Sequence, residues 1–226
     1  MNAKRKAVII GGNGNLGQAV AAELTKTGFE IDPLWIGNEH PDATLESSYS
    51  TLPSKIDVAI YLAGVNHVSP LHELSSANWD RVINVNLRGA FLFAKHAFAS
   101  LKACPGSLFL TVSSIMATHP YPNRTAYASA KAALEGLTRA LAVEWGPYGI
   151  NTHCLRLGHL SGLMKSTPSD PRLLDAVKEK TPGHRLLDAN DVASYISWLA
   201  SRGAASLTGT VIDFDPGYTL NRWPIA

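Results

Sequence analysis

Tyr127 and Lys131 are four residues apart at the start of an alanine-rich stretch, and Ser114 lies 13 residues upstream of Tyr127. On a helix, residues i and i+4 share a face, so the ammonium of Lys131 would lie beside the phenol of Tyr127. A neighbouring cation favours the ionised phenol and lowers its pKa, which makes Tyr127 a candidate proton donor or acceptor. Such pairs are common on helices by chance, so this interpretation depends on the elements that position them.

Length and composition indicate one globular domain, residues 1–226. The chain is 46% hydrophobic, enough to fill a sizeable core. Its net charge is +2 and its longest basic run is Lys4-Arg5-Lys6, so we expect no nucleic-acid partner. Cys104 and Cys154 lack metal-ligand spacing and favour a reducing, cytoplasmic location. The apolar run after Lys6 is too short for a signal segment or membrane span, so we expect no membrane partner.

Short β-branched segments alternate with longer amphipathic ones, which is typical of βαβ units. The predicted strands are Ala7–Gly11, Glu30–Ile36, Val58–Ala63, Ser107–Ser113, Asn151–Leu157 and Val211–Phe214. The predicted helices are Leu16–Thr27, Ala77–Leu101, Ala126–Trp145 and Asp188–Ala200, with a short one near Leu173–Lys180. We therefore expect an α/β fold, a doubly wound parallel sheet with helices on both faces.

Local signals mark two helix ends and one long loop. Ser75 or Ser76 could cap the second helix, and Gly146-Pro147 should end the third. Residues 158–185 are rich in proline, and a loop of that length inside a compact domain is usually functional. We expect this segment, with Leu163 and Met164, to form a lid over the substrate.

A glycine-rich turn follows the first predicted strand and opens a helix. Glycines let the backbone approach a pyrophosphate, and the helix N-terminus offers unpaired N–H groups and a partial positive charge. The pattern predicts a Rossmann-like dinucleotide site. Its expected cofactor contacts are Gly11, Asn13, Gly14, Asn15, Leu16 and Gly17.

The choice between NAD and NADP stays open. The second predicted strand ends in Leu34-Trp35-Ile36-Gly37-Asn38, without the acidic residue that binds the ribose of NAD or the arginine that suits NADP. Glu39 and Asp42 are nearby acids, and no Lys or Arg occurs between Lys26 and Lys55. The absence of a basic side chain in this stretch favours NAD slightly.

The glycine turn, Ser114 and the Tyr127/Lys131 pair occur in the order of the short-chain dehydrogenase/reductase family, and the chain resembles a compact member of its classical branch over nearly its whole length. Residues 84–89 resemble the family's mid-helix asparagine motif. Leu62-Ala63-Gly64 resembles the end of its Asn-Asn-Ala-Gly motif, with Tyr61 and Leu62 in place of the asparagines. Leu207-Thr208-Gly209 and Asp215-Pro216-Gly217 resemble its closing strand and turn.

This resemblance implies an NAD(P)-dependent oxidoreductase that transfers a hydride between the nicotinamide and a secondary alcohol or ketone. The implied catalytic residues are Asn86, Ser114, Tyr127 and Lys131, and the implied further cofactor contacts are Ala63, Gly64, Tyr127 and Lys131. Tyr127 would be the proton donor or acceptor and Ser114 would hold the substrate oxygen. Lys131 would lower the Tyr127 pKa and bind the ribose, and Asn86 would support a water-linked proton path. A homodimer or homotetramer is also implied, with the two long helices pairing across subunits.

The sequence departs from the family pattern in three places. The spacing Gly11-x-x-Gly14-x-x-Gly17 is closer to the extended branch, and Asn15 replaces the middle glycine, so we expect an unusual backbone there. The segment from Gly17 to Ala63 is short, which predicts that the helix and strand after the second strand are trimmed or lost. Leu157-Gly158 replaces a Pro-Gly pair that contacts the nicotinamide end.

Two other functions remain open, a cofactor-recycling epimerase or dehydratase and a non-catalytic dinucleotide-sensing protein. The extended-type glycine spacing favours the first alternative, and the retention of Asn86, Ser114, Tyr127 and Lys131 disfavours the second. No metal site is expected, because the histidines lack the i, i+4 spacing of a helical zinc site. His119, Tyr121 and the pair Asn66-His67 follow predicted strand ends and are candidates to face the substrate.

Overall fold

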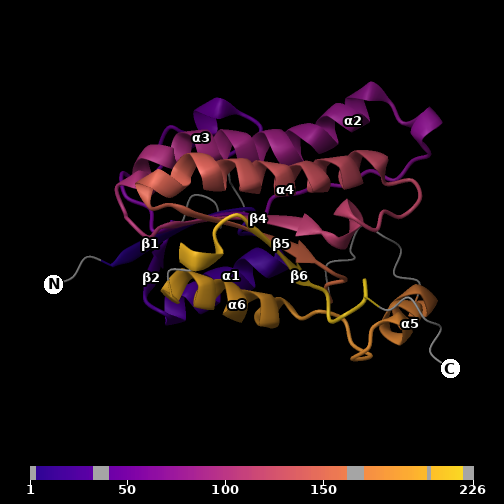
Figure 1. Cartoon of the computed structure of the whole chain (residues 1–226). Helices are drawn as coiled ribbons and strands as arrows, with labels where there is room; N and C mark the ends of the chain where they lie inside the picture. Colours follow the sequence, from indigo (N-terminus) through magenta and orange to yellow (C-terminus); the bar gives the residue numbers. More distant parts are fainter. Residues whose placement is uncertain (1–3, 33–40, 162–170, 203–204, 221–226) are drawn as a thin grey trace.

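The computed structural model describes residues 4–32, 41–161, 171–202 and 205–220, and its centre is a parallel sheet with helices on both faces (Figure 1). The six strands have the order β2-β1-β3-β4-β5-β6. They are β1 Arg5–Ile10, β2 Phe29–Ile31, β3 Val58–Tyr61, β4 Leu108–Ser114, β5 Asn151–Leu157 and β6 Thr210–Phe214. The predicted α/β, doubly wound architecture is confirmed.

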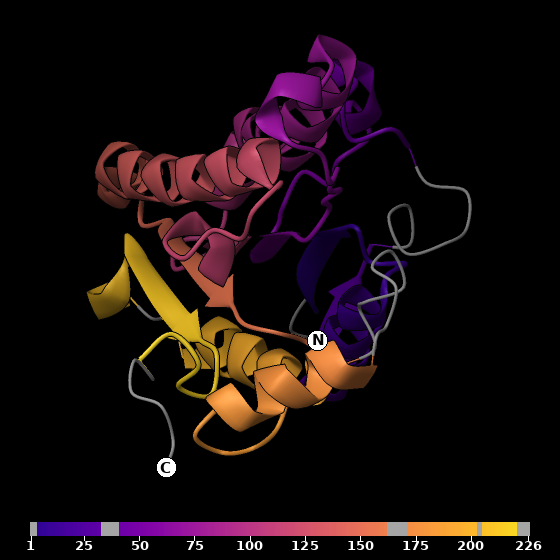
Figure 2. The same cartoon turned by 90° about the vertical axis from the view of Figure 1, so that its right-hand side faces the viewer.

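The helices form one layer on each face of the sheet, and one short helix lies at the carboxyl ends of the strands. α1 (Asn15–Lys26) and α6 (Ala189–Arg202) lie on one face of the sheet. The segments α2 (Ser76–Ile83), α3 (Gly89–Lys102) and α4 (Thr125–Trp145) lie on the other. Figure 2 looks onto the carboxyl ends of the strands, where α5 (Pro171–Lys180) lies in front of the sheet. Short 3₁₀ turns occur at Glu46–Tyr49, Leu71–Glu73, Ile115–Ala117, Gly146–Tyr148 and Ala205–Leu207.

Alternate side chains of the central strands enter two separate cores. In β1, Ala7 and Ile9 pack in the core beneath α1 and α6, whereas Val8 and Ile10 pack in the core beneath α3 and α4. All four side chains are fully buried. This is the period-2 pattern of a strand covered on both faces, and it explains why these strands are continuously apolar in the sequence.

The ends of the helices that carry the site follow local rules. The Ser75 hydroxyl accepts a hydrogen bond from the backbone N–H of Asn78 at 3.2 Å and caps α2. α4 ends at Trp145, and a 3₁₀ turn with Pro147 leads to Gly149, whose φ of 73° lies in the left-handed region. The predicted cap and stop are both confirmed.

One predicted helix is interrupted. Instead of a continuous helix over 77–101, α2 and α3 are separated by a π-helical segment, Asn84–Arg88. A π turn adds a residue without disturbing the apolar pattern around it, so the helical period of the sequence does not reveal it.

β2 is an edge strand. It begins at Phe29 and pairs with β1, and within the described ranges no strand pairs with its other side. This agrees with the expected trimming after the second strand. The predicted continuation of the strand to Ile36, and the NAD/NADP cues at 34–39, lie outside the described residues.

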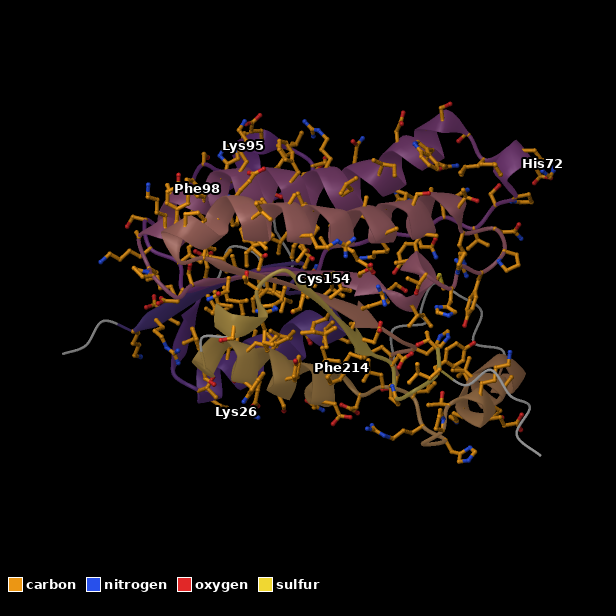
Figure 3. All side chains as sticks on the ribbon, in the orientation of Figure 1. Lys26, His72, Lys95, Phe98, Cys154 and Phe214 are labelled. Carbon is orange, nitrogen blue, oxygen red and sulfur yellow. The ribbon has the colours of Figure 1, made fainter. Side chains whose placement is uncertain are left out.

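Figure 3 shows Cys154 between the two helical layers, while Lys26, His72 and Lys95 lie at the periphery. Cys154 is fully buried, whereas Cys104 is only partly buried. Both thiols are free. A search of the described residues finds no helix with the length and apolar character needed to cross a membrane.

Candidate active site

A pocket of about 810 Å³ opens at the carboxyl ends of the strands. Its walls come from the turn after β1, the segments after β3, β4, β5 and β6, the first turns of α4, and α5. The lining includes Gly11, Gly14, Leu16, Gly17, Leu62, Gly64, Val65, Asn66, Arg81, Ser114, Tyr121, Arg124, Tyr127, Lys131, Leu157, Gly158, His159, Ala176, Val177, Lys180 and Tyr218. The predicted proton-handling residues and the glycine turn therefore share one cavity, apart from Asn86.

Three predicted residues meet at the α4 side of this pocket. Ser114 is the last residue of β4, and its hydroxyl lies close enough to the Tyr127 phenol to lower the pKa of that phenol. Lys131 follows Tyr127 by one helical turn and is 5% exposed. Its Nζ donates to the Val112 carbonyl of β4 at 2.7 Å and lies 5.5 Å from the centre of the Tyr127 ring. The strand end and the helix thus hold hydroxyl, phenol and amine together.

The pKa shifts of Tyr127 and Lys131 differ from those expected from the sequence. Burial raises the pKa of the Tyr127 phenol above its ordinary value, although the nearby Ser114 hydroxyl and Arg124 guanidinium act in the opposite direction. Burial also lowers the pKa of Lys131 to about 8. The expectation that Lys131 lowers the Tyr127 pKa is wrong, because desolvation disfavours the charged forms of both groups.

Asn86 lies in the π-helical segment, fully buried behind the pocket wall. Its Nδ2 donates to the carbonyls of Val65 at 2.7 Å and Val82 at 2.8 Å. Its Oδ1 has no hydrogen-bond partner among the described residues. A Cβ placed on Gly64 would lie 2.8 Å from this oxygen and 3.5 Å from Lys131 Nζ, so both atoms border the same glycine.

The tip of the glycine turn brings backbone close to backbone. Gly11 has a φ of 84°, and a Cβ there would lie 2.7 Å from the Ala63 backbone nitrogen. A Cβ on Gly17 would lie 2.5 Å from the Gly12 Cα, so α1 can start this close to the turn only with glycine. Asn15 is the first residue of α1 and has no positive φ, so the expected unusual backbone at Asn15 is wrong. The left-handed residue is Gly11 instead.

These residues fit the phosphates of a dinucleotide. α1 begins after Gly14 with no side-chain cap and no acidic residue in its first turn, which leaves N–H groups and a partial positive charge for an anion. Gly11, Gly14 and Gly17 line the pocket here, and Asn13 and Asn15 are exposed beside it. Gly64, next to the partly buried Ala63, also lines it.

Three polar rings form the far wall. The Tyr121 hydroxyl shares hydrogen bonds of 2.7 Å with His159 Nε2 and with the Tyr218 hydroxyl. Burial raises the Tyr121 pKa and lowers that of His159, so these two groups are uncharged near pH 7. Tyr121 and Asn66 line the pocket as predicted, whereas His119 and His67 do not.

A buried ion pair fixes α4 against the sheet beneath the site. Both carboxylate oxygens of Glu135 accept from Arg156 of β5, at 2.9 and 2.8 Å. The Ser113 hydroxyl donates to Glu135 at 3.0 Å and to the Lys131 carbonyl at 2.9 Å. Arg156 also pairs with Asp213 of β6. The helix that carries Tyr127 is therefore tied to three strands.

Several pocket residues were not predicted from the sequence. Arg81, Arg124, Lys180 and Tyr218 line the pocket. Arg124 precedes Tyr127 by three residues, so the helical spacing that linked Tyr127 to Lys131 could have identified it. No group of three metal-ligating side chains occurs among the described residues.

Comparisons with known proteins agree with this arrangement. The sequence model of a family described as enoyl-(acyl carrier protein) reductase matches residues 36–219. The chain is 33% identical to cis-4-hydroxycyclohexanecarboxylate dehydrogenase of Sinomonas cyclohexanicum, over 94% of this chain and 86% of that protein. It is 30% identical to 3beta-hydroxysteroid dehydrogenase 1 of Eggerthella lenta, over 92% and 76% of the two chains.

A solved structure supports the fold. The 3-ketoacyl-(acyl-carrier-protein) reductase of Brucella melitensis, complexed with NADH, superposes with a TM-score of 0.84 at 24% identity, over 95% of this chain and 98% of that one. The family match covers most of the chain and includes Asn86, Ser114, Tyr127 and Lys131. The chain therefore belongs to the short-chain dehydrogenase/reductase family of NAD(P)-dependent oxidoreductases.

Proposed function

We propose that this protein transfers a hydride between NAD(P) and a small secondary alcohol or ketone, with Tyr127 as the proton donor or acceptor. The observation that carries this proposal is the meeting of Ser114, Tyr127 and Lys131 in the pocket that the glycine turn also lines. When bound, the nicotinamide supplies or accepts the hydride. The chain's own residues position the substrate and move the proton.

Tyr127 and Ser114 act on the substrate oxygen. Because its pKa is raised, Tyr127 keeps its proton near pH 7 and is ready to donate it to a carbonyl oxygen. Ser114, which lines the pocket beside Tyr127, holds the same oxygen and stabilises the negative charge that develops on it. In the oxidative direction Tyr127 must first lose its proton, so that direction should speed up as the pH rises.

Lys131 and Asn86 supply the proton path. Lys131 Nζ and the unpartnered Asn86 Oδ1 border Gly64, so a water there would have a donor on one side and an acceptor on the other. Protons would pass between solvent and Tyr127 by this route. Lys131 would also bind the nicotinamide ribose.

The proposed cofactor contacts are Gly11, Asn13, Gly14, Asn15, Leu16, Gly17, Ala63, Gly64, Tyr127 and Lys131. Their support is the uncapped N-terminus of α1 and the close backbone packing at the turn. We infer a preference for NAD over NADP, because no Lys or Arg occurs between Lys26 and Lys55. Separate titrations with NADH and NADPH test this preference.

The substrate enters beneath the 158–185 segment, which we propose as a lid. Ala176, Val177 and Lys180 of α5 line the pocket and support this role, while Leu163 and Met164 lie outside the described residues. The curated relatives above are named for cyclic secondary alcohols. A panel that includes 4-oxocyclohexanecarboxylate and simple cyclic ketones is therefore the first to try.

Tyr127→Phe tests the central role. General acid–base catalysis contributes about 10²- to 10⁴-fold, so we expect kcat to fall by about this factor while the Kd for NADH changes less than about twofold. Tyr148→Phe is the matched control, because Tyr148 follows the same helix but is 43% exposed and outside the pocket lining. A Tyr127→Phe protein with full turnover would overturn the assignment.

We also propose a homodimer or homotetramer in which α3 and α4 pair across subunits. Phe91 of α3 and Val143 of α4 are exposed by 49% and 79%, which supports an apolar contact there. Sedimentation velocity would reveal a monomer if this is wrong. A cytoplasmic location is proposed from the two free cysteines.

A further inference from the structure

The charged side chains around the pocket all have one sign. Its lining includes Arg81, Arg124, Lys131 and Lys180, and within the described residues it includes no Asp or Glu. Lys131 already has a partner in the Val112 carbonyl and belongs to the proton path. Two arginines remain without an assigned role.

Among the described residues, no carboxylate neutralises either arginine. In the described part of the chain, the guanidinium groups of Arg81 and Arg124 form no ion pair, whereas Arg156 and Arg185 both pair with carboxylates. Arg124 lies close enough to Tyr127 for its charge to act on the phenol. An anion held by Arg124 would therefore be next to the reacting group.

The wall that carries these arginines also holds an unpaired amide. Asn66 lines the pocket, and its buried Oδ1 has no hydrogen-bond partner among the described residues. The Ser69 backbone N–H donates to the Asn123 carbonyl at 3.1 Å, which ties the 65–69 loop to the residue before Arg124. The side-chain amide of Asn86 bonds Val65 and Val82, the neighbours of Asn66 and Arg81. Asn66, Arg81 and Arg124 thus form one wall, which we call the basic wall.

The basic wall is separate from the phosphate site. The pyrophosphate seat is at the N-terminus of α1, after β1. Arg124 is the residue before α4, three positions from Tyr127, and Arg81 lies on α2. Tyr121, His159 and Tyr218 add hydrogen-bonded polar rings to the lining of the same pocket. A ligand in this pocket can therefore meet both positive charge and polar rings.

We propose that the substrate of this oxidoreductase is a hydroxy acid or keto acid whose carboxylate is bound by Arg124, with Arg81 as a supporting contact. The inference rests on the proposed function, since the second group of the same molecule is the oxygen at Ser114 and Tyr127. A guanidinium binds a carboxylate with two parallel hydrogen bonds, which fixes orientation as well as position. Arg124 is then the residue that selects the substrate class.

The test measures binding without turnover. The protein is saturated with its preferred nucleotide in the oxidised form, which cannot give a hydride to a ketone. Calorimetry then compares three keto acids with their methyl esters: 3-oxobutanoate, 4-oxopentanoate and 4-oxocyclohexanecarboxylate. A charged hydrogen-bonded pair predicts that at least one acid binds about 10- to 100-fold more tightly than its ester.

Variants assign this preference to Arg124. Arg124→Gln should remove the acid-over-ester preference without weakening ester binding more than about twofold. Arg124→Lys should restore part of it, because the charge is kept and the paired geometry is lost. Arg139→Gln should change nothing, since Arg139 is an exposed residue of α4 outside the pocket lining.

Two outcomes would overturn the inference: no acid is preferred by the natural protein, or the preference survives in Arg124→Gln. Either would make Arg124 a solvated surface charge only. The outcome for the proposed function is separate. Reduction of neutral ketones with no acid preference would leave hydride transfer intact, whereas Arg124-dependent acid binding without reduction of any ketone would remove hydride transfer and keep the ligand class.

Discussion

The Tyr61 hydroxyl donates a hydrogen bond to the Val85 carbonyl, 2.5 Å away, within the π-helical segment that carries Asn86. A Cβ on Gly89 would lie 2.1 Å from this hydroxyl, so glycine at that position gives the phenol its space. Tyr61 occupies a place where the family motif has asparagine. The chain thus uses a longer side chain from β3 to hold the widened helical turn.

Tyr61→Phe should therefore affect catalysis as well as stability. Loss of the hydrogen bond costs about 1 kcal/mol of unfolding free energy. A displaced Asn86 should lower kcat by about 10- to 100-fold, because a small misplacement of a catalytic group slows the reaction strongly. Ser100→Ala removes a similar bond, to the Pro53 carbonyl at 2.6 Å, and should cost similar stability with kcat unchanged. Equal kcat values in the two variants would contradict a positioning role for Tyr61.

Gly14→Ala should weaken nucleotide binding without lowering the stability of the fold. The nearest atom to a Cβ on Gly14 is the Gly11 carbonyl oxygen at 3.7 Å, an ordinary contact, so thermal stability should be nearly unchanged. The added methyl group would lie where a phosphate must approach the backbone, so the Kd for NADH should rise at least about 10-fold. Gly136→Ala, on α4 with nothing within 4 Å of its new Cβ, should bind NADH normally and gain about 0.5–1 kcal/mol. Unchanged NADH affinity in Gly14→Ala would argue against a phosphate at this turn.

The buried amine of Lys131 predicts a pH-dependent stability. Its pKa is about 8 in the folded protein and 10.5 in its ordinary state, so between these values the unfolded chain binds more protons. Stability should therefore rise with pH across this window, by about 3 kcal/mol if Lys131 acts alone. Below pH 8 the cost of burying the charged amine is fully present.

Lys131→Met isolates that effect. Urea unfolding of the two proteins at pH 7, 8, 9 and 10 should show the natural protein gaining stability relative to the variant as the pH rises. Parallel curves would mean that Lys131 is not desolvated as described. Circular dichroism of both native states checks that the folds are the same.

Removing one partner of the Glu135–Arg156 pair should lower the stability of the fold strongly, whereas replacing both partners by apolar residues should lower it little. Glu135→Ala leaves Arg156, whose side chain is 15% exposed, with only the exposed Asp213, and should cost about 3 kcal/mol. The double variant Glu135→Leu/Arg156→Met should recover most of that loss. Asp213→Asn, which removes a half-exposed partner, should cost at most about 1 kcal/mol. Denaturant midpoints of the four proteins give the comparison, and a double variant no more stable than Glu135→Ala would contradict the coupling.

The sequence predicted the elements that depend on local pattern. β5 occurs at Asn151–Leu157 as predicted, and α4 begins one residue before its predicted start. The Gly146-Pro147 signal between them marks the end of α4 and so limits where β5 can begin. The order of the motifs was enough to bring Ser114, Tyr127 and Lys131 together.

The features that the sequence did not predict depend on contacts between segments that are far apart in the chain. The π-helical segment is held by Tyr61 and by Asn86, and no periodicity encodes those bonds. Tyr121 and Tyr218 are 97 residues apart in the chain, so their shared hydrogen bond follows only from the sheet order. The Tyr127 pKa was predicted in the wrong direction because spacing indicates which charges are near but not how much water is excluded.

The short edge strand β2 has a consequence for how this protein can vary. In a parallel sheet each strand bonds only its neighbours, and the pocket lining comes from the ends of the other five strands. A βα unit can therefore be lost or gained outside β2 without moving the proton-transfer groups. Changes at the β2 edge of the sheet can therefore alter how the far end of a cofactor is recognised. The proton-transfer groups at the ends of the central strands stay in place.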